Sequence, residues 1–78
     1  MKTAVIIPTQ GYTTEFVVIS TWKRRLGEIV EKGETLFEME SDKVVLEMAA
    51  PCSGELSEIL KDNGEEANIG EIVAYIEC

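Results

Sequence analysis

Histidine is absent from this 78-residue sequence, and cysteine and proline occur only twice each. Without histidine the chain cannot build the Ser-His or Cys-His pairs of nucleophilic catalysis, or metal sites with imidazole ligands. The carboxylates are numerous but scattered, with no close pairing typical of general acid–base catalysis. These features argue against an enzyme active site within the chain.

Long apolar runs are also missing, and no segment approaches the length of a membrane span. The first apolar run, residues 4–7, is broken at Pro8 and is too short for the core of a signal peptide. We therefore expect a cytoplasmic location, or the mitochondrial matrix if the domain was excised from an organellar protein. In either compartment Cys52 and Cys78 are expected to be reduced thiols rather than a disulfide.

Basic residues are scarce, since 7 Lys and Arg stand against 15 Asp and Glu, for a net charge of −8. This balance argues against nucleic acid and anionic membranes as partners. It would steer a basic protein surface toward the chain, although the plain alternative is that it only maintains solubility. The length fits one small domain, residues 1–78, with little room for an enclosed active-site cavity.

One sequence unit occurs twice. At an offset of 37 residues, the Gly-Glu pairs of the first half coincide with those of the second: Gly27-Glu28 with Gly64-Glu65, and Gly33-Glu34 with Gly70-Glu71. At an offset of 43, Pro8 coincides with Pro51 and Gly11 with Gly54. The first half therefore carries about six extra residues between Gly11 and Ile19. Two copies indicate a pseudo-two-fold domain rather than a solenoid, which needs at least three repeats.

The local sequence favours short strands. Residues 4–7, 16–22 and 44–48 are rich in β-branched or aromatic residues and stop at turn signals. Residues 22–26 could form one helical turn, but Gly27 and the strand-like run before it argue against this. We therefore predict an all-β fold, a flattened barrel or sandwich of two small antiparallel sheets with pseudo-two-fold symmetry.

The predicted core takes apolar residues from both halves. Leu56 and Ile59 differ in parity along their strand, so a bulge or bend is expected between them. The predicted members are Val5, Ile7, Val18, Trp22, Leu36, Met39, Leu46, Met48, Leu56, Ile59, Val73 and Ile76.

A tight hairpin is predicted where the two halves meet. Only Ser41, Asp42 and Lys43 separate a strand that ends at Glu40 from one that begins at Val44. Ser and Asp favour turn starts, which leaves Lys43 exposed at or beside the tip. Such a lysine is either an ordinary edge-protecting charge or an attachment point whose amine must reach another enzyme. Turn chemistry alone favours the ordinary charge.

The residues around this turn change the balance. The segment Phe-Glu-Met-Glu-Ser-Asp-Lys-Val-Val-Leu-Glu-Met-Ala-Ala-Pro at 37–51 resembles the lipoylation hairpin of the dihydrolipoamide acyltransferase (E2) family, whose core is Glu-(Ser/Thr)-Asp-Lys-(Ala/Val). Further positions that resemble the family are Gly11, Glu15, Trp22, Gly27, Val30, Gly33, Pro51 and Gly54. The resemblance covers essentially the whole chain and implies a lipoyl domain of a 2-oxo acid or acetoin dehydrogenase complex.

The resemblance implies that lipoic acid is attached covalently to Lys43 by a lipoate ligase or a lipoyl/octanoyl transferase. The arm would then shuttle acyl groups and reducing equivalents between a thiamine-diphosphate-dependent decarboxylase, the acyltransferase core and dihydrolipoamide dehydrogenase. The domain itself would be a non-catalytic carrier. Asp42, Val44 and Glu40 are the candidate positions for recognition by the ligase or partner. Glu38 and Glu47 either extend this negative charge or are simply outward strand positions.

The extra residues of the first half correspond to a loop that lies beside the lysine turn in this family. That loop helps a decarboxylase to recognise its own domain. Phe16 departs from the glycine that many relatives carry there, which leaves the loop conformation and partner specificity open. Tyr12 could equally pack onto the neighbouring hairpin. The candidate partner-loop residues are Gln10, Gly11, Tyr12, Thr13 and Glu15.

Three other functions fit less well. Biotin carriers share the fold but have methionine on both sides of the lysine, where this chain has Asp42 and Val44. Glycine-cleavage carriers are longer and contain extra helices. An unmodified binding or structural module of the same fold is the third alternative. The pseudo-symmetry places Cys52 and Cys78 at the end opposite the lysine, so exchange with the dithiolane is not expected.

Overall fold

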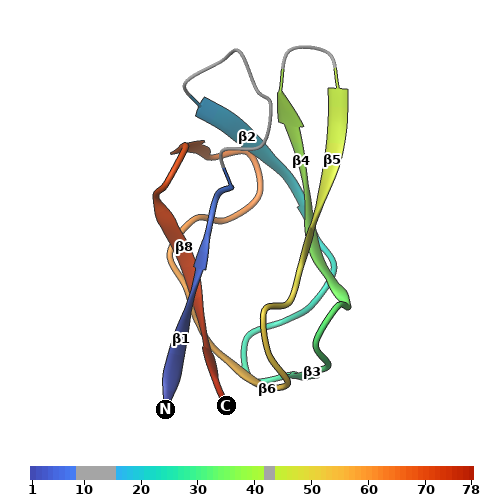
Figure 1. The fold of residues 1–78 in the computed structure, drawn as a ribbon. Coiled ribbons are helices and arrows are strands. Elements are labelled where there is room, and N and C mark those ends of the chain that lie inside the picture. Colours follow the sequence, from blue (N-terminus) through green and yellow to red (C-terminus); the bar gives the residue numbers. More distant parts are fainter. Residues whose placement is uncertain (9–15, 42–43) are drawn as a thin grey trace.

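The computed structural model describes residues 1–8, 16–41 and 44–78 (Figure 1). These residues contain eight strands: β1 (Lys2–Ile6), β2 (Phe16–Trp22), β3 (Ile29–Val30), β4 (Thr35–Ser41), β5 (Val44–Ala49), β6 (Gly54–Ile59), β7 (Glu66–Asn68) and β8 (Ile72–Glu77). No helix occurs in the described residues, and so none that could span a membrane. The all-β prediction is confirmed, and the helical turn considered at residues 22–26 does not form.

The strands form two four-stranded antiparallel sheets, with the orders β1-β8-β6-β3 and β5-β4-β2-β7. The sheets face each other in an elongated molecule of 32 × 19 × 19 Å. Both chain termini lie at one end, and β4 and β5 extend to the other (Figure 1). Each sheet contains strands from both sequence halves, so neither half can complete a sheet alone. The predicted flattened sandwich is confirmed.

The repeated Gly-Glu pairs are four copies of one turn. Their glycines have φ between 84° and 89°, at the third turn position, where a positive φ is typical of type II turns. In each turn the glutamate N–H donates to the carbonyl three residues earlier, at 2.9–3.1 Å. The glutamate carboxylate accepts a hydrogen bond from the N–H of that same residue, at 2.6–3.0 Å. The repeated Gly-Glu pairs of the sequence therefore correspond to one turn conformation that occurs four times.

These turns also connect the halves reciprocally. Gly27 N–H donates to the Leu56 carbonyl, and its repeat mate Gly64 N–H donates to the Ile19 carbonyl, each at 2.7 Å. Ile19 and Leu56 are themselves mates at the offset of 37, so the two bonds are equivalent. A second equivalent pair, at 2.9 Å, runs from Gly33 to Ala50 and from Gly70 to Ile7. The bonds confirm the pseudo-two-fold symmetry read from the sequence.

The core lies between the sheets, and most of the predicted members belong to it. The fully buried apolar residues are Val5, Ile7, Val17, Ile19, Val30, Leu36, Phe37, Met39, Ala50, Leu56, Ala67, Val73, Ala74 and Ile76. Trp22, Leu46, Met48 and Ile59 pack against them and are half-buried. Val18 was wrongly predicted, because its neighbours Val17 and Ile19 point inward and it pairs with Glu40 and Glu66. Residues 16–19 are all apolar, so this strand lacks the alternation that reveals its inner face.

Bulges in two strand pairs change which side chains point into the core. The β6–β8 register shifts between Leu56 and Glu58, which confirms the irregularity predicted between Leu56 and Ile59. The β4–β5 register shifts between Thr35 and Phe37, and the adjacent residues Leu36 and Phe37 are both buried. Phe37, absent from the predicted core, packs on Trp22 with ring centroids 4.6 Å apart.

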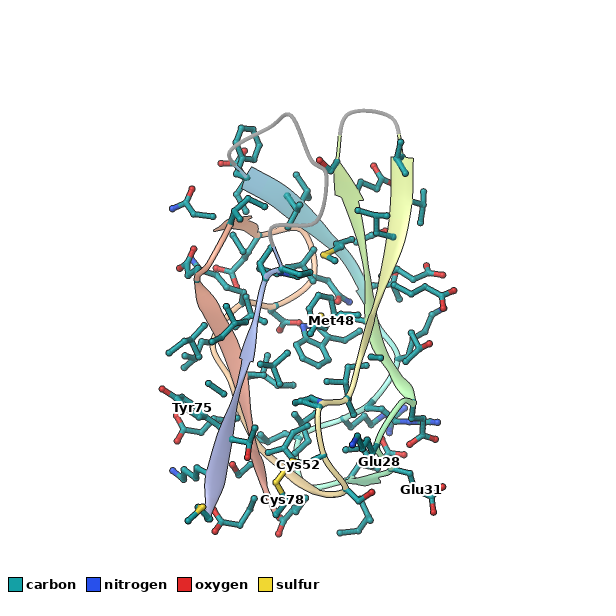
Figure 2. All side chains as sticks on the ribbon, viewed as in Figure 1. Glu28, Glu31, Met48, Cys52, Tyr75 and Cys78 are labelled. Carbon is teal, nitrogen blue, oxygen red and sulfur yellow. A yellow bond between two sulfur atoms is a disulfide. The ribbon has the colours of Figure 1, made fainter. Side chains whose placement is uncertain are left out.

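The expectation of reduced cysteines is wrong, because Cys52 and Cys78 form a disulfide with a Cα–Cα distance of 6.5 Å. The absence of a secretion signal favours reduced thiols, which was the basis of the expectation. Two cysteines 26 residues apart carry no local sequence pattern that predicts their pairing. The predicted place of the two cysteines in the fold is confirmed, since both lie at the end that holds the termini (Figure 2). The closed loop contains β6, β7 and β8, and loop-closure entropy gives such a cross-link about 3–4 kcal/mol of stabilisation.

Gly54 lies where β6 starts beside the end of β8. A Cβ at this position would lie 2.1 Å from the Glu77 carbonyl oxygen and 3.0 Å from the Cys78 Cα. Because both contacts are backbone atoms, we expect Gly54→Ala to lower the free energy of unfolding by about 3 kcal/mol. Urea denaturation measures the loss. The control is Gly33→Ala, which has φ +89° but no atom within 4 Å, and should lose about 1–2 kcal/mol. An equal or smaller loss for Gly54→Ala would contradict the crowding.

Two equivalent turn glutamates predict part of the acid sensitivity. The pKa values of Glu34 and Glu71 lie below the usual 4.5, because each carboxylate accepts a backbone N–H and also lies near Arg24 or Lys61, respectively. A lowered folded pKa contributes stability that is present above the unfolded pKa and is lost as the pH falls through the folded value. The double variant Glu34→Gln/Glu71→Gln should therefore show a shallower fall of Tm below about pH 4.5 than the parent chain.

Thermal melts between about pH 3 and pH 7 test this acid dependence. Glu55→Gln is the matched control, because Glu55 is an exposed strand residue outside the four turns. Parallel Tm profiles for the parent chain and the double variant would show that the turn carboxylates do not contribute.

Candidate functional site

The candidate site is the end of the β4–β5 hairpin, opposite the termini (Figure 1). The two strands pair in antiparallel register up to Ser41 and Val44, with Glu40 opposite Val45 and Met39 opposite Leu46. Asp42 and Lys43, which connect this last pair, lie outside the described residues. The register thus defines the base of the connection, and the position of the Lys43 side chain stays a prediction.

The base of the hairpin is buried on one side and exposed on the other. Ser41, last in β4, is only 6% exposed, and among the described residues it is the one buried polar residue. Val44 and Val45, which begin β5, are 52% and 60% exposed. Sequence reasoning treated Ser41 only as a turn residue and missed its burial. The signal was present, because Ser41 shares the parity of Met39, which faces the core.

The carboxylates near the hairpin differ in their surroundings. Glu38 and Glu47 face each other across β4 and β5. Glu38 lies 3.9 Å from Lys23 Nζ, and the Glu47 carboxylate accepts a hydrogen bond from Thr35 Oγ1 at 3.0 Å. These two residues therefore have structural partners on the sheet surface, which favours their interpretation as outward strand positions.

Glu40 is exposed and closer to the connection. It pairs with Val18 of β2, and Val18 in turn pairs with Glu66 of β7. Two carboxylates thus flank an apolar side chain on the outer face of this sheet. This arrangement gives the hairpin end a negative surface that would attract a basic partner.

The predicted partner-loop residues, Gln10, Gly11, Tyr12, Thr13 and Glu15, lie outside the described residues. The chain before them ends its pairing at Ile7, whose N–H donates to the Glu71 carbonyl at 3.1 Å. The chain after them begins β2 at Phe16, which is 44% exposed and pairs with Asn68. The start of β2 lies at the same end of the molecule as the end of β4 and the start of β5 (Figure 1).

The described residues of the hairpin end form a surface. Within residues 1–8, 16–41 and 44–78 there is no pocket and no group of three or more side chains arranged to hold a metal ion. This part of the chain provides a paired two-stranded base with exposed apolar and acidic side chains around it. A covalently attached group is the kind of cofactor that such a base can present.

Comparison with known proteins identifies related chains. The profile of the Biotin_lipoyl family, described as "Biotin-requiring enzyme", matches residues 3–76. The chain is 40% identical over 76 residues to the dihydrolipoyllysine-residue succinyltransferase component of the 2-oxoglutarate dehydrogenase complex of Rickettsia typhi, covering 97% of this chain and 19% of that protein. Identity to the same component of Bacillus subtilis is 47% over 58 residues, covering 74% and 14%.

A further relative is the dihydrolipoyllysine-residue acetyltransferase component of the acetoin cleaving system of Bacillus subtilis. It is 34% identical over 76 residues, covering 97% of this chain and 19% of that protein. The chain thus spans about a fifth or less of the length of these relatives.

Solved structures show the same fold. The urea carboxylase of Kluyveromyces lactis superposes with a TM-score of 0.83 at 23% identity, over 99% of this chain and 6% of that one. The lipoyl domain of the 2-oxoglutarate dehydrogenase complex from Azotobacter vinelandii superposes with a TM-score of 0.76 at 28% identity, over 96% and 98%. The chain therefore belongs to the Biotin_lipoyl family and has the lipoyl-domain fold of the E2 components of 2-oxo acid dehydrogenase complexes.

Proposed function

We propose that residues 1–78 act as one lipoyl carrier domain in which Lys43 is the residue that is lipoylated. The observation that carries the proposal is the β4–β5 register, in which Ser41 pairs with Val44 and only Asp42 and Lys43 join the strands. A lysine in so short a connection has little neighbouring chain to pack against. The resemblance of residues 37–51 to a lipoylation hairpin supports the same assignment.

The described residues fit a tethered cofactor. Ser41 and Met39 are buried beneath the connection, so the base of the hairpin is fixed against the core. Val44 and Val45 lie in solvent beside it, where an enzyme could approach. When bound, the lipoyl group supplies a dithiolane that accepts acyl groups and electrons. The chain supplies position, and tethering raises the effective concentration of the group at each partner.

The proposed partners follow from this role. A lipoate ligase or lipoyl/octanoyl transferase would modify Lys43, and the loaded domain would serve a thiamine-diphosphate-dependent decarboxylase, an acyltransferase core and dihydrolipoamide dehydrogenase. The names of the relatives support a complex for a 2-oxo acid or acetoin. Because the chain spans about a fifth of those relatives, we place the acyl transfer itself outside this domain. The expected location is the cytoplasm, or the mitochondrial matrix in an organellar protein.

Biotin is the competing cofactor, because the family profile that matches this chain is described as "Biotin-requiring enzyme". The residues beside the lysine favour lipoate. Asp42 and Val44 stand where biotinylated relatives carry methionine. The relatives that are 34–47% identical are all named as dihydrolipoyllysine-residue transferases. An unmodified module is the remaining alternative, and the same experiment tests it.

Intact-protein mass spectrometry tests the modification. The chain is produced in cells that are supplied with lipoate and contain a competent ligase. We expect a single lipoyl increment that peptide mapping places on Lys43 and that the variant Lys43→Gln loses. The control is Lys32→Gln, which removes an exposed lysine at another turn and should keep the increment. A biotin increment, or no increment despite the competent ligase, would reject the proposal.

Recognition by the modifying enzyme gives a second test. We propose that the Glu40 carboxylate guides a basic enzyme surface toward Lys43, together with Asp42 and Val44. Glu40→Gln should then lower kcat/KM for lipoylation about two- to fivefold at low salt, with the difference fading as salt screens the charge. Glu55→Gln is the matched control, because it removes the same charge near the terminal end. Equal rates for the two variants at low salt would contradict the role of Glu40.

A further inference from the structure

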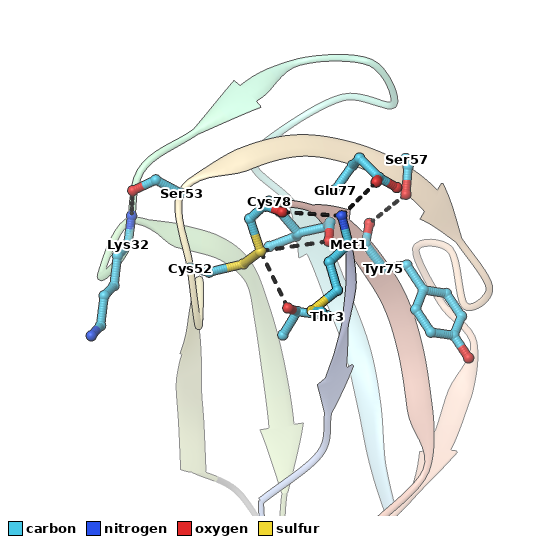
Figure 3. The surroundings of a disulfide bond; sticks show 10 residues. Met1, Thr3, Lys32, Cys52, Ser53, Ser57, Tyr75, Glu77 and Cys78 are labelled. Carbon is cyan, nitrogen blue, oxygen red and sulfur yellow. Dashed lines mark hydrogen bonds and ion pairs between the residues drawn. A yellow bond between two sulfur atoms is a disulfide. The ribbon is translucent and has the colours of Figure 1, made fainter.

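The Cys52–Cys78 disulfide lies where three segments of the chain meet (Figure 3). Cys52 belongs to the connection between β5 and β6, and Cys78 directly follows β8. The Cys78 N–H donates to the Met1 carbonyl at 2.9 Å, and the Met1 ammonium contacts the Glu77 carboxylate at 2.9 Å and the Cys78 carbonyl at 3.2 Å. The cross-link therefore holds the start of the chain, its end and the connection between the sheets together.

The two cysteines differ in their access to solvent. Cys78 is an exposed residue, whereas Cys52 is half-buried and packs against the hydrophobic core. Exposed disulfides are more easily reduced than buried ones, and regulatory disulfides come from this class. Because Cys78 is the more exposed residue of the two, we assign its sulfur as the one that a thiolate from solution attacks. Cys52 would then be the leaving thiol.

The surroundings of the Cys78 sulfur suit both redox states. Thr3 Oγ1 lies 3.2 Å from it, and because a disulfide sulfur carries no hydrogen, the hydroxyl is the donor in the oxidised state. The Ile76 carbonyl oxygen lies 3.8 Å from the same sulfur. In the reduced state the Cys78 S–H can donate to that oxygen. Reduction thus gives this sulfur a hydrogen to donate, which it lacks in the disulfide.

We propose that Cys52–Cys78 is a reversible redox switch, opened by small dithiols, that loosens the terminal end of the domain and leaves the hairpin end unchanged. In the first step a dithiol thiolate attacks the Cys78 sulfur, the S–S bond breaks, and Cys52 leaves as a thiolate that takes up a proton. The second thiol of the reductant then displaces Cys78 and closes a cyclic disulfide. Two electrons and two protons pass to the protein.

The fold persists in the reduced state because other interactions hold β8. Its residues stay paired with β1 on one side and β6 on the other, and Val73, Ala74 and Ile76 are buried in the core. The strand β4, whose last residue is Ser41, belongs to the other sheet and ends at the opposite end of the molecule (Figure 1). Opening is therefore local, of the kind that hydrogen exchange resolves amide by amide.

Amide hydrogen exchange of the 78-residue chain in defined ratios of reduced and oxidised dithiothreitol tests the switch. On reduction we expect exchange at least about tenfold faster for the Cys78 N–H and for the Lys32 N–H, which donates to Ser53 Oγ beside Cys52. Amides of the paired residues Met39 and Leu46 should change less than about twofold, and reoxidation should restore every rate. A monothiol should leave its mixed disulfide on Cys78.

The double variant Cys52→Ser/Cys78→Ser is the control, and its exchange should be fast at the terminal end with or without dithiol. If this variant does not fold, hydrogen exchange of the parent chain at the different dithiothreitol ratios still tests whether the disulfide opens reversibly. Three outcomes would overturn the switch: reduction only when the whole domain unfolds, equal exchange in both states, or equal loosening of the hairpin end. Lys43→Gln should switch like the parent chain, so the result stands apart from the lipoylation test.

Discussion

Reciprocal hydrogen bonds between the two sequence halves are the constraint on which this fold depends. Gly27 and Gly64 donate across the domain to Leu56 and Ile19, and each bond is the image of the other. The donors lie in turns that need a positive φ, so a glycine is required at each. Each half thus satisfies backbone groups of its partner and covers its apolar face. A 78-residue chain has a small core, and that core takes buried apolar residues from both halves.

The strand order explains how the described part of the candidate site is held. β4 lies between β5 and β2 in its sheet, and its inner face places Met39 and Ser41 in the core. The strands are thus held together up to the Ser41–Val44 pair, which is the last one before the connection. A carrier needs this combination, because the attached group must move between partners while its attachment point is recognised by shape and charge. Glu40 and Val44 supply the described part of that surface.

Sequence reasoning recovered the repeat, the all-β fold, the hairpin strands and the place of both cysteines, because each leaves a local signature. The Gly-Glu pairs encode turns, and β-branched runs encode strands. It failed where the signature was absent. Residues 16–19 are uniformly apolar, so Val18 was assigned to the wrong face, and Phe37 was missed because a bulge turns it inward. The disulfide joins residues 26 apart that share no pattern, so its formation follows from the closed fold alone. At the site, Glu40 and Val44 are exposed, but their role in recognition stays a prediction, as do the roles of Asp42, Lys43 and the loop residues Gln10, Gly11, Tyr12, Thr13 and Glu15.

The two ends of the barrel differ in their side-chain interactions. The hairpin end combines buried Met39 and Ser41 with exposed Val44 and Val45, and the proposed carrier role depends on the exposed side chains being accessible to other proteins. The terminal end has no such demand, and it holds the disulfide, the Met1–Glu77 ion pair and the close approach of Gly54 to β8. Since the sheets are continuous between the ends, strong interactions at one end stabilise the whole domain without restricting the other. The cross-link at the terminal end also lies away from the hairpin end, so the proposed lipoylation and the proposed disulfide reduction concern opposite ends of the domain.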